Sequence, residues 1–301
     1  MHVSFYLGAC FMFKRIALFM ALNLGIMLTL GVLAHVFGLT GGTGKNLNLT
    51  QVFGFSLLFG FGGAFISLLL SKPMAKWSVS AKPVDTNTPL GRWLYSTVEN
   101  QSQRAGLKTP EVCIYESPEP NAFATGAFKN SALVAVSTGL LDRLSKDEIE
   151  AVLGHEIGHI ANGDMVTMTL LQGVLNTFVI FIARIAGWVF DRVIMKNEED
   201  GPGIGQIVVT IIMEIALGMA AMIVLAWFSR RREFRADRAG ADLTTRSAMA
   251  NALRRLSGEA PSAGLPANLA AFGMRNSQSW LAIFSTHPPM EQRIAALEDM
   301  R

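Results

Sequence analysis

The sequence contains few cysteines, which cross-link small secreted domains, and few charged residues, which cover the surface of soluble domains. Only two cysteines occur in 301 residues, Cys10 and Cys113, and they lie far apart without the short spacing of thiolate metal ligands. This argues against a disulfide framework and against a zinc site built from thiolates.

Charged residues make up only 16% of the chain and hydrophobic residues 50%, with a mean hydropathy of +0.35. A chain this apolar is not an ordinary soluble protein, so the composition predicts an integral membrane protein.

Four long apolar segments are present, each close to the roughly 20 residues that a helix needs to cross a bilayer. They cover residues 16–39, 52–70, 165–190 and 207–228. The last two are interpreted either as full spans or as a hairpin that enters the bilayer only in part. Residues 1–13 lack the basic start and the small-residue cleavage site of a secretory signal peptide. We therefore expect translation to begin at Met12, or this stretch to extend the first helix at the interface.

Basic residues flank the first two apolar segments on one side only. Lys14 and Arg15 precede the first segment and Lys72 and Lys76 follow the second, whereas the loop between the segments carries only Lys45. The positive-inside rule therefore predicts that both basic clusters are cytoplasmic. This placement accounts for the isoelectric point near 9.0 and makes nucleic acid a weaker candidate partner.

Two charged residues interrupt the last two apolar segments. Arg184 lies six residues before Phe190, and Glu214 lies seven residues after Ile207. At 1.5 Å rise per residue, both are roughly 9–11 Å from the same end of the hairpin. We expect the two side chains to pair across the hairpin, and the alternative is two separate charges that reach water.

The stretch from Ser145 to Gly163 has the features of a helix packed on one face. Ser145 can cap the start, Glu148 follows in the position of a capping-box partner, and Gly163 can close the end. His155 and His159 are four residues apart, so a helix presents both imidazoles on one face.

These two imidazoles and the intervening Glu156 fit a hydrolytic zinc site. Zinc binds imidazole nitrogens at roughly 2.0–2.1 Å, often takes a carboxylate as the third protein ligand, and leaves one position for water. Glu156 could then take a proton from that water, which is the general-base role of glutamate in the H-E-x-x-H motif. The alternative is an amphipathic helix with two ordinary histidines and a surface glutamate.

An arginine-rich run further along the chain offers a candidate for the third ligand. Glu233 and Asp237 are four residues apart and share a helical face. Glu233 could complete the metal site, while Asp237 could accept a hydrogen bond from the outer nitrogen of a ligand histidine. On charge pattern alone, a solvated helix held by salt bridges is the better interpretation.

The segment between the second and third apolar stretches is expected to fold as an α+β unit. Residues 90–105 have the pattern of a helix, and residues 112–116 and 133–137 have the pattern of strands. Asn121 follows two prolines and by itself indicates an ordinary turn, and His287 by itself indicates a loop histidine.

Taken together, H-E-x-G-H from His155 and E-F-x-A-D from Glu233, with apolar segments between them, resemble the HtpX family of membrane-bound zinc metalloproteases, relatives of the CaaX prenyl proteases. The resemblance runs from about Arg15 to the C-terminus. It includes N-A-F-A-T-G from Asn121 and S-T-H-P-P from Ser285, both of which are typical of that family.

The resemblance implies a role for each candidate residue. One Zn²⁺ per chain would be bound by His155, His159 and Glu233. Glu156 would be the catalytic base, and Asp237 would accept a hydrogen bond from a ligand histidine without binding the metal itself. Contacts with substrate or with the transition state are implied for Asn121, His287 and Arg293.

The fold implied by the resemblance is mainly α: an integral membrane protein with four hydrophobic helices and a cytoplasmic zincin-like α+β metallopeptidase domain. Residues 1–71 would form a transmembrane hairpin and residues 72–164 the catalytic part with the zinc-binding helix. Residues 165–228 would form a second hairpin, and residues 229–301 the cytoplasmic part with the third ligand.

The implied function is that of a multi-pass zinc endopeptidase of the bacterial inner membrane, cleaving misfolded or damaged membrane proteins on the cytoplasmic side as quality control under stress. Its partners would be these substrates and the lipid bilayer. No nucleic-acid partner is expected, and a homo-oligomer is possible. One alternative is a non-proteolytic scaffold or assembly factor with a structural zinc site, which would not need Glu156 as a base. A transporter is a third alternative, although its polar binding groups should lie within the spans.

Overall fold

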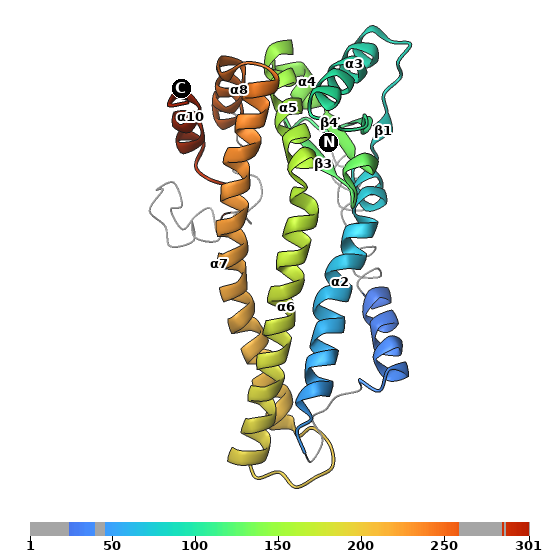
Figure 1. Ribbon diagram of the computed structural model, residues 1–301, viewed down its shortest axis with the longest axis vertical. Coiled ribbons are helices and arrows are strands. Elements are labelled where there is room, and N and C mark those ends of the chain that lie inside the picture. The colour runs from blue at the N-terminus through green and yellow to red at the C-terminus, as the bar shows by residue number, and fades with distance from the viewer. Residues whose placement is uncertain (1–23, 40–45, 259–284, 286, 301) are drawn as a thin grey trace, which may run out of the picture. The chain divides into compact units, whose positions relative to one another are not determined.

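The chain is mainly helical over the residues that the computed structural model describes, which are 24–39, 46–258, 285 and 287–300 (Figure 1). Its internal contacts divide the chain into two compact units. One unit comprises residues 1–67 and 169–221, and the other comprises residues 68–168 and 222–301. The division into four parts at residues 71, 164 and 228 stays a prediction.

Among the described residues, three helices are long and apolar enough to cross a membrane. They are α2 (Leu49–Ser78), α6 (Asp164–Val189), which continues to Ile194 as a π-helical turn, and α7 (Ile204–Leu243). The first predicted segment is represented by a shorter apolar helix, Leu24–Val36, and its residues 16–23 lie outside the described residues. The prediction of a membrane protein is confirmed with three candidate spans, while the fourth span stays a prediction.

Helices α2 and α6 approach each other closely where glycines lie opposite larger residues. A Cβ atom on Gly60 would lie 2.6 Å from the backbone nitrogen of Thr177, and one on Gly173 would lie 2.7 Å from the ring of Phe61. Because lipid is as apolar as the side chains, helices in a bilayer associate mainly through such close packing. The two glycines therefore favour direct contact between α2 and α6.

The charges predicted to pair across the apolar hairpin are arranged differently. The guanidinium carbon of Arg184 lies 3.8 Å from the ring centroid of Phe55, on α2. Arg184 and Glu214 both belong to the described residues, and the structure shows no ion pair between them. A cation–π contact thus takes the place of the predicted ion pair.

The second unit contains a four-stranded sheet with the order β1-β2-β4-β3. Strands β2 (Glu111–Tyr115) and β4 (Leu133–Ser137) pair in parallel, and β1 (Lys82–Pro83) and β3 (Ala122–Thr125) pair antiparallel to them at the two edges. Both predicted strands are confirmed to within one residue. Asn121 immediately precedes the edge strand β3.

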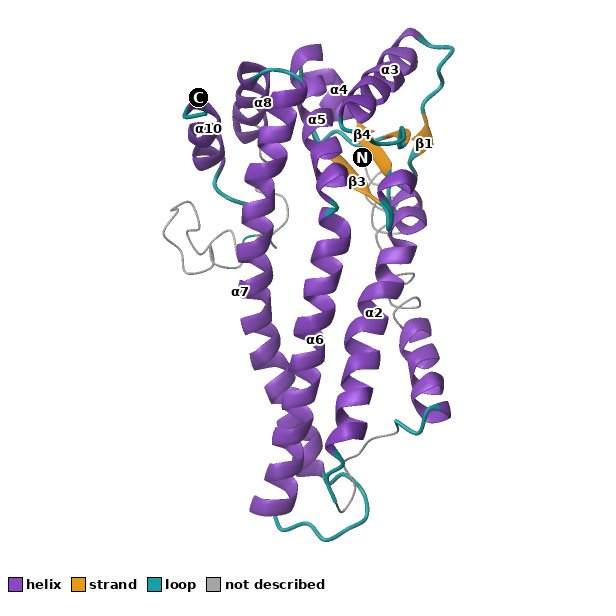
Figure 2. Cartoon of the chain, in the orientation of Figure 1, coloured by secondary structure: helices purple, strands orange, loops and turns teal. Residues whose placement is uncertain are grey.

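Helices α3 (Pro89–Arg104) and α5 (Lys146–Asn162) pack on one face of this sheet. Figure 2 shows both helices beside the strands. Leu94 of α3, Val134 of β4 and Leu153 of α5 are fully buried in the shared core. The short α4 (Thr138–Arg143) leads from β4 towards α5, which also packs against α8 (Arg246–Gly258). Helix α10 (Met290–Glu298) packs against α8. Helix α5 therefore contacts both the sheet and α8.

Candidate metal centre and catalytic site

Helix α5 forms as its sequence predicts. The Ser145 side chain accepts a hydrogen bond from the backbone N–H of Glu148, and the Glu148 carboxylate accepts one from the backbone N–H of Ser145, which completes a capping box. At the other end, Gly163 adopts φ 68°, the left-handed conformation that closes helices. Between these ends, His155 and His159 lie one turn apart and are both buried. The helix thus presents two imidazoles on one face, as expected.

Helix α7 meets α5 through a contact between small residues. A Cβ atom on Gly154 would lie 3.1 Å from the Cα of Gly240, and one on Gly158 would lie 2.6 Å from the Cβ of Ala239. No larger side chain fits at these points, so the two helix backbones approach directly. This approach brings Glu233 and the residues one turn beyond it beside the paired histidines.

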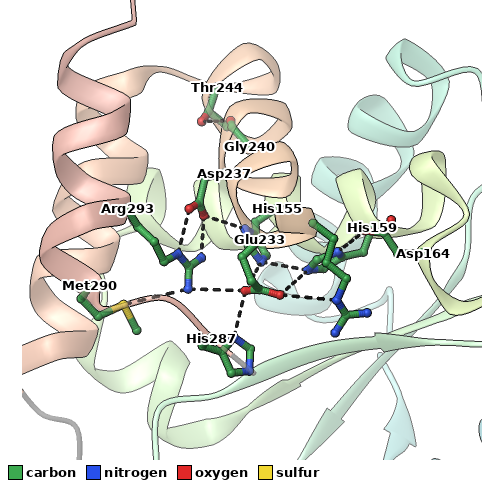
Figure 3. Close-up of polar contacts among 11 residues, drawn as sticks. His155, His159, Asp164, Glu233, Asp237, Gly240, Thr244, His287, Met290 and Arg293 are labelled. Atoms are coloured by element: carbon green, nitrogen blue, oxygen red, sulfur yellow. Dashed lines mark hydrogen bonds and ion pairs between the residues drawn. The ribbon is translucent and has the colours of Figure 1, made fainter. Parts of the chain in front are cut away.

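The side chains of His155, His159 and Glu233 form a compact group of potential metal ligands (Figure 3). The two Nε2 atoms are 3.1 Å apart, His155 Nε2 is 3.7 Å from Glu233 Oε2, and His159 Nε2 is 3.5 Å from Glu233 Oε1. Ligand atoms bound to zinc at ~2.0–2.1 Å in a tetrahedron are about 3.3 Å apart. Glu233 is 1% exposed, and its Oε1 has no hydrogen-bond partner among the described residues. A buried carboxylate oxygen that accepts no hydrogen bond from the described residues, with Arg232 Nε 3.8 Å away, lies beside two facing imidazole nitrogens, and this arrangement fits a divalent cation.

Each of the two histidines is oriented from behind by a buried carboxylate. His155 Nδ1 lies 2.9 Å from Asp237 Oδ1, and His159 Nδ1 lies 2.6 Å from Asp164 Oδ2. An Nδ1–H that donates to a carboxylate leaves Nε2 as the atom available to a metal. Burial disfavours the charged His159, but the hydrogen bond with Asp164 and the nearby Glu233 carboxylate outweigh this effect and raise the His159 pKa to about 9.

Asp164 was missed by the sequence reasoning, although a signal was present. It is the first residue of α6 and directly follows Gly163, so the turn that ends α5 brings it back towards His159. A carboxylate five residues after the second histidine of the motif was therefore a visible candidate. Asp237, which was proposed from its spacing, holds the other histidine.

The C-terminal residues suggested by the family resemblance also lie at this site. Arg293 forms a two-pronged ion pair with Asp237, with Nε 2.7 Å from Oδ2 and Nη2 2.5 Å from Oδ1, and it is 5% exposed. Its Nη1 is 3.5 Å from Glu233 Oε2, and His287 Nδ1 is 2.9 Å from the same oxygen. Arg293 thus contacts both carboxylates, and Arg293 and His287 both contact Oε2 of Glu233.

A cavity of about 220 Å³ lies beside this group. Glu156, Asn121, His287 and Arg293 contribute to its polar wall. The remaining wall is mainly apolar and is formed by Leu140, Val152, Met249, Leu253, Leu256 and Met290. The start of the edge strand β3 also lines the cavity, through Asn121 and Ala122, so one side chain of an extended peptide that pairs with this strand has room to enter.

Glu156 differs from the two histidines of the motif because it is only partly buried, and it lines this cavity. Burial raises the pKa of its carboxyl group, while the neighbouring imidazoles and a backbone hydrogen bond from Ala124 oppose the rise. A carboxyl group with a raised pKa beside an open cavity suits proton transfer at neutral pH. The structure therefore separates Glu156 from the three ligand candidates.

Comparison with known proteins gives one consistent result. The model of peptidase family M48 matches residues 90–301. The chain is 55% identical over 291 residues to a "Protease HtpX homolog" of Leptothrix cholodnii, covering 95% of this chain and 99% of that protein. It is 50% identical over 293 residues to a "Protease HtpX homolog" of Bordetella pertussis, covering 96% and 99%. The crystal structure of S. mikatae Ste24p matches 98% of this chain and 67% of that one, with a TM-score of 0.67 at 18% identity, which shows a shared fold.

Proposed function

Since the chain belongs to peptidase family M48, among the HtpX proteases, we propose that it is a zinc-dependent endopeptidase of the bacterial inner membrane that hydrolyses misfolded or damaged membrane proteins. That it is a membrane metalloprotease follows from the family and from the three apolar helices. The identity of the metal, the cytoplasmic side and the quality-control role belong to the proposal.

One observation carries the chemistry: three buried ligand candidates, two histidines and one glutamate, meet next to a cavity that a second carboxylate, Glu156, also lines. His155, His159 and Glu233 would hold one zinc ion per chain. When bound, zinc supplies a Lewis acid that polarises the scissile carbonyl and makes water a stronger acid.

The protein's own groups account for the remaining steps. Glu156 takes the proton from the attacking water and passes it to the leaving amine, for which its raised pKa is suited. Asp237 and Asp164 keep the histidine rings in the orientation that exposes Nε2. Arg293 and His287 contact Oε2 of Glu233, so both fix the position of this carboxylate. His287 also lines the cavity, where it can contact a bound substrate.

The cytoplasmic orientation is supported by the distribution of basic residues. Lys72 and Lys76 follow the apolar part of α2, and Arg230 to Arg232 follow that of α7. Such residues favour the cytoplasmic side of a membrane. Because the two histidines precede the third apolar segment and Glu233 follows the fourth, an even number of crossings is needed for the ligands to meet.

A scaffold with a structural zinc site is the weaker alternative. Structural sites are usually closed by four protein ligands, whereas catalytic sites keep one position open. Among the described residues, three His, Cys, Asp or Glu side chains form the group that could hold a metal ion here, and a cavity adjoins it.

The proposal is tested with the purified full-length chain, an unfolded soluble reporter protein and zinc analysis. Glu156→Gln should lower cleavage by roughly 10²–10⁴-fold while the zinc content stays at about one per chain. A matched control is Glu150→Gln, which removes a carboxylate from the same helix where it accepts a hydrogen bond from Trp93; this variant should cleave normally. Equal cleavage by wild type and Glu156→Gln would contradict the mechanism.

A further inference from the structure

The apolar helix α6 carries an arginine for which the structure shows no acceptor among the described residues. The guanidinium of Arg184 stacks on the ring of Phe55, 3.8 Å from its centroid. Its Nε is buried without a hydrogen-bond partner, and no hydrogen bond or ion pair of Arg184 is found within the described part of the chain. A cation within an apolar span is costly, so such residues are rare and face a partner or a functional site.

This side chain does not simply reach back to the membrane surface. Phe55 lies six residues after Leu49, the start of α2, which is about 9 Å along the helix axis. Because the guanidinium lies over that ring, Arg184 is held at the depth of Phe55 and is not extended towards the end of its own helix. Phe55 in turn stacks on Phe59, with ring centroids 4.2 Å apart, so the platform under the cation is itself packed.

Helix α7 carries polar side chains on a single face. Gln206, Thr210 and Glu214 follow one another at four-residue spacing, which aligns them along one side of the helix. Gln206 is buried and its Oε1 has no partner among the described residues. Glu214 is near enough to interact electrostatically with Arg184, yet forms no ion pair with it.

The same face of α7 is in contact with α6. The Thr210 hydroxyl lies 3.4 Å from the carbonyl oxygen of Ala183, and a Cβ atom on Gly187 would lie 2.2 Å from that hydroxyl. A strip of polar groups therefore runs along the seam between two helices that are otherwise apolar. Within it, Arg184 and Glu214 offer a donor and an acceptor that are not used on each other.

We propose that Arg184 and Glu214 form a polar site within the apolar helices that binds a carboxamide or carboxylate side chain of a transmembrane helix in a substrate. This inference rests on the proposed function, because it names how a membrane-protein substrate is recognised. Polar side chains in correctly assembled membrane proteins are paired with one another, so an unpaired one marks a helix that is not assembled. Arg184 and Glu214 together supply a hydrogen-bond donor and an acceptor for a substrate side chain that lies at the same depth in the bilayer as Arg184.

The test compares two single-span substrates in vesicles of zwitterionic phosphatidylcholine. Both carry the same cleavable soluble tail, and their apolar helices differ only in having asparagine or leucine at the depth of Arg184. The wild-type enzyme should cleave the asparagine substrate with a kcat/KM about 3–20-fold higher, which is the range expected of one hydrogen bond between helices in a bilayer. Arg184→Gln and Glu214→Leu should each reduce this preference, while cleavage of a soluble unfolded reporter should stay unchanged.

A matched control is Gln172→Leu, because Gln172 lies on the same helix but already bonds to Asn176 at 2.9 Å. This variant should retain the preference for asparagine. A third substrate with lysine at the test position should not be preferred by the wild type but should be preferred by Arg184→Glu.

Several outcomes would overturn the inference. One is equal cleavage of the asparagine and leucine substrates by the wild type. Another is a loss of cleavage in Arg184→Gln that is as large for the soluble reporter as for the asparagine substrate. A third is a change in cleavage by Arg184→Gln that occurs only in vesicles with anionic lipid. The last result would assign Arg184 to lipid headgroups. Failure of the wild type to cleave the soluble reporter would instead refute the proposed endopeptidase function.

Discussion

The replacement Asp237→Asn tests whether the carboxylate behind His155 sets the affinity for the metal. In the structure, Asp237 Oδ1 lies 2.9 Å from His155 Nδ1, and both of its oxygens also contact Arg293. Asparagine keeps the size of the side chain but turns one acceptor oxygen into a donor and removes the negative charge. Either His155 loses its acceptor or Arg293 loses one of its two contacts.

Two effects of different size are expected from this single change. Loss of a carboxylate that orients a ligand histidine typically weakens metal binding by about 10–100-fold, or about 1.4–2.7 kcal/mol. Arg293 is also left with a weakened partner, and breaking a buried ion pair on one side costs about 3–5 kcal/mol of folding stability. Stability therefore falls more than metal affinity, and the two must be measured separately.

The double variant Asp237→Asn/Arg293→Met separates the two effects. Removing the arginine that has lost its ion pair with Asp237 should recover much of the lost stability, because a buried pair can be replaced by apolar groups at little cost. It should not recover zinc affinity, because His155 still lacks its carboxylate acceptor. Asp164→Asn should weaken zinc binding by a similar factor, since Asp164 stands behind His159 at 2.6 Å.

Zinc affinity is measured by titrating the metal-free full-length enzyme in chelator-buffered zinc, and stability by thermal unfolding of the metal-free form. Glu150→Gln is the control for loss of a carboxylate elsewhere in this unit. Wild-type zinc affinity in both Asp237→Asn and Asp164→Asn would refute the argument that carboxylates orient the ligands.

Three further predictions concern the surroundings of the site. Gly158→Ala should lower zinc content and cleavage, because the added Cβ would lie 2.6 Å from a side-chain atom of α7 and push the two ligand-bearing helices apart; unchanged zinc content would contradict this. Burial alone would raise the Glu148 pKa, but hydrogen bonds from the Ser145 backbone and from Arg255 outweigh it and lower the pKa. The stability from Glu148 should therefore be fully present above about pH 4.3 and be lost as the pH falls through the lower folded pKa. Thermal unfolding of wild type and Glu148→Gln between pH 3 and 7 should converge at the acid end, and parallel curves would count against it. Leu256→Trp should narrow the cavity and shift cleavage-site preference in a peptide library towards smaller side chains, whereas an unchanged preference would mean that the cavity does not receive the substrate.

The local parts of the site could be predicted because they depend on residues close in the sequence. The capping box, the closing glycine and the four-residue spacing of the histidines all act within α5, and the structure has each of them where the pattern predicts it. The strands at residues 112–116 and 133–137 were visible for the same reason, as short apolar runs between turn residues. The apolar segments were visible from length and composition alone.

The position of Glu233 could not be predicted in the same way, because it depends on a contact between distant helices. Judged by charge alone, the arginine-rich run around Glu233 predicts a solvated helix, yet Glu233 and Asp237 are 1% and 2% exposed. What places them beside the histidines is the direct approach of α5 and α7 at Gly154 and Gly240. Glycines occur in helices for several physical reasons, and no sequence pattern indicates that Gly154 contacts Gly240. The histidine motif is thus a local property of one helix, whereas the metal site requires two backbones to meet, and a side chain at the point of contact would remove the site while leaving the motif intact.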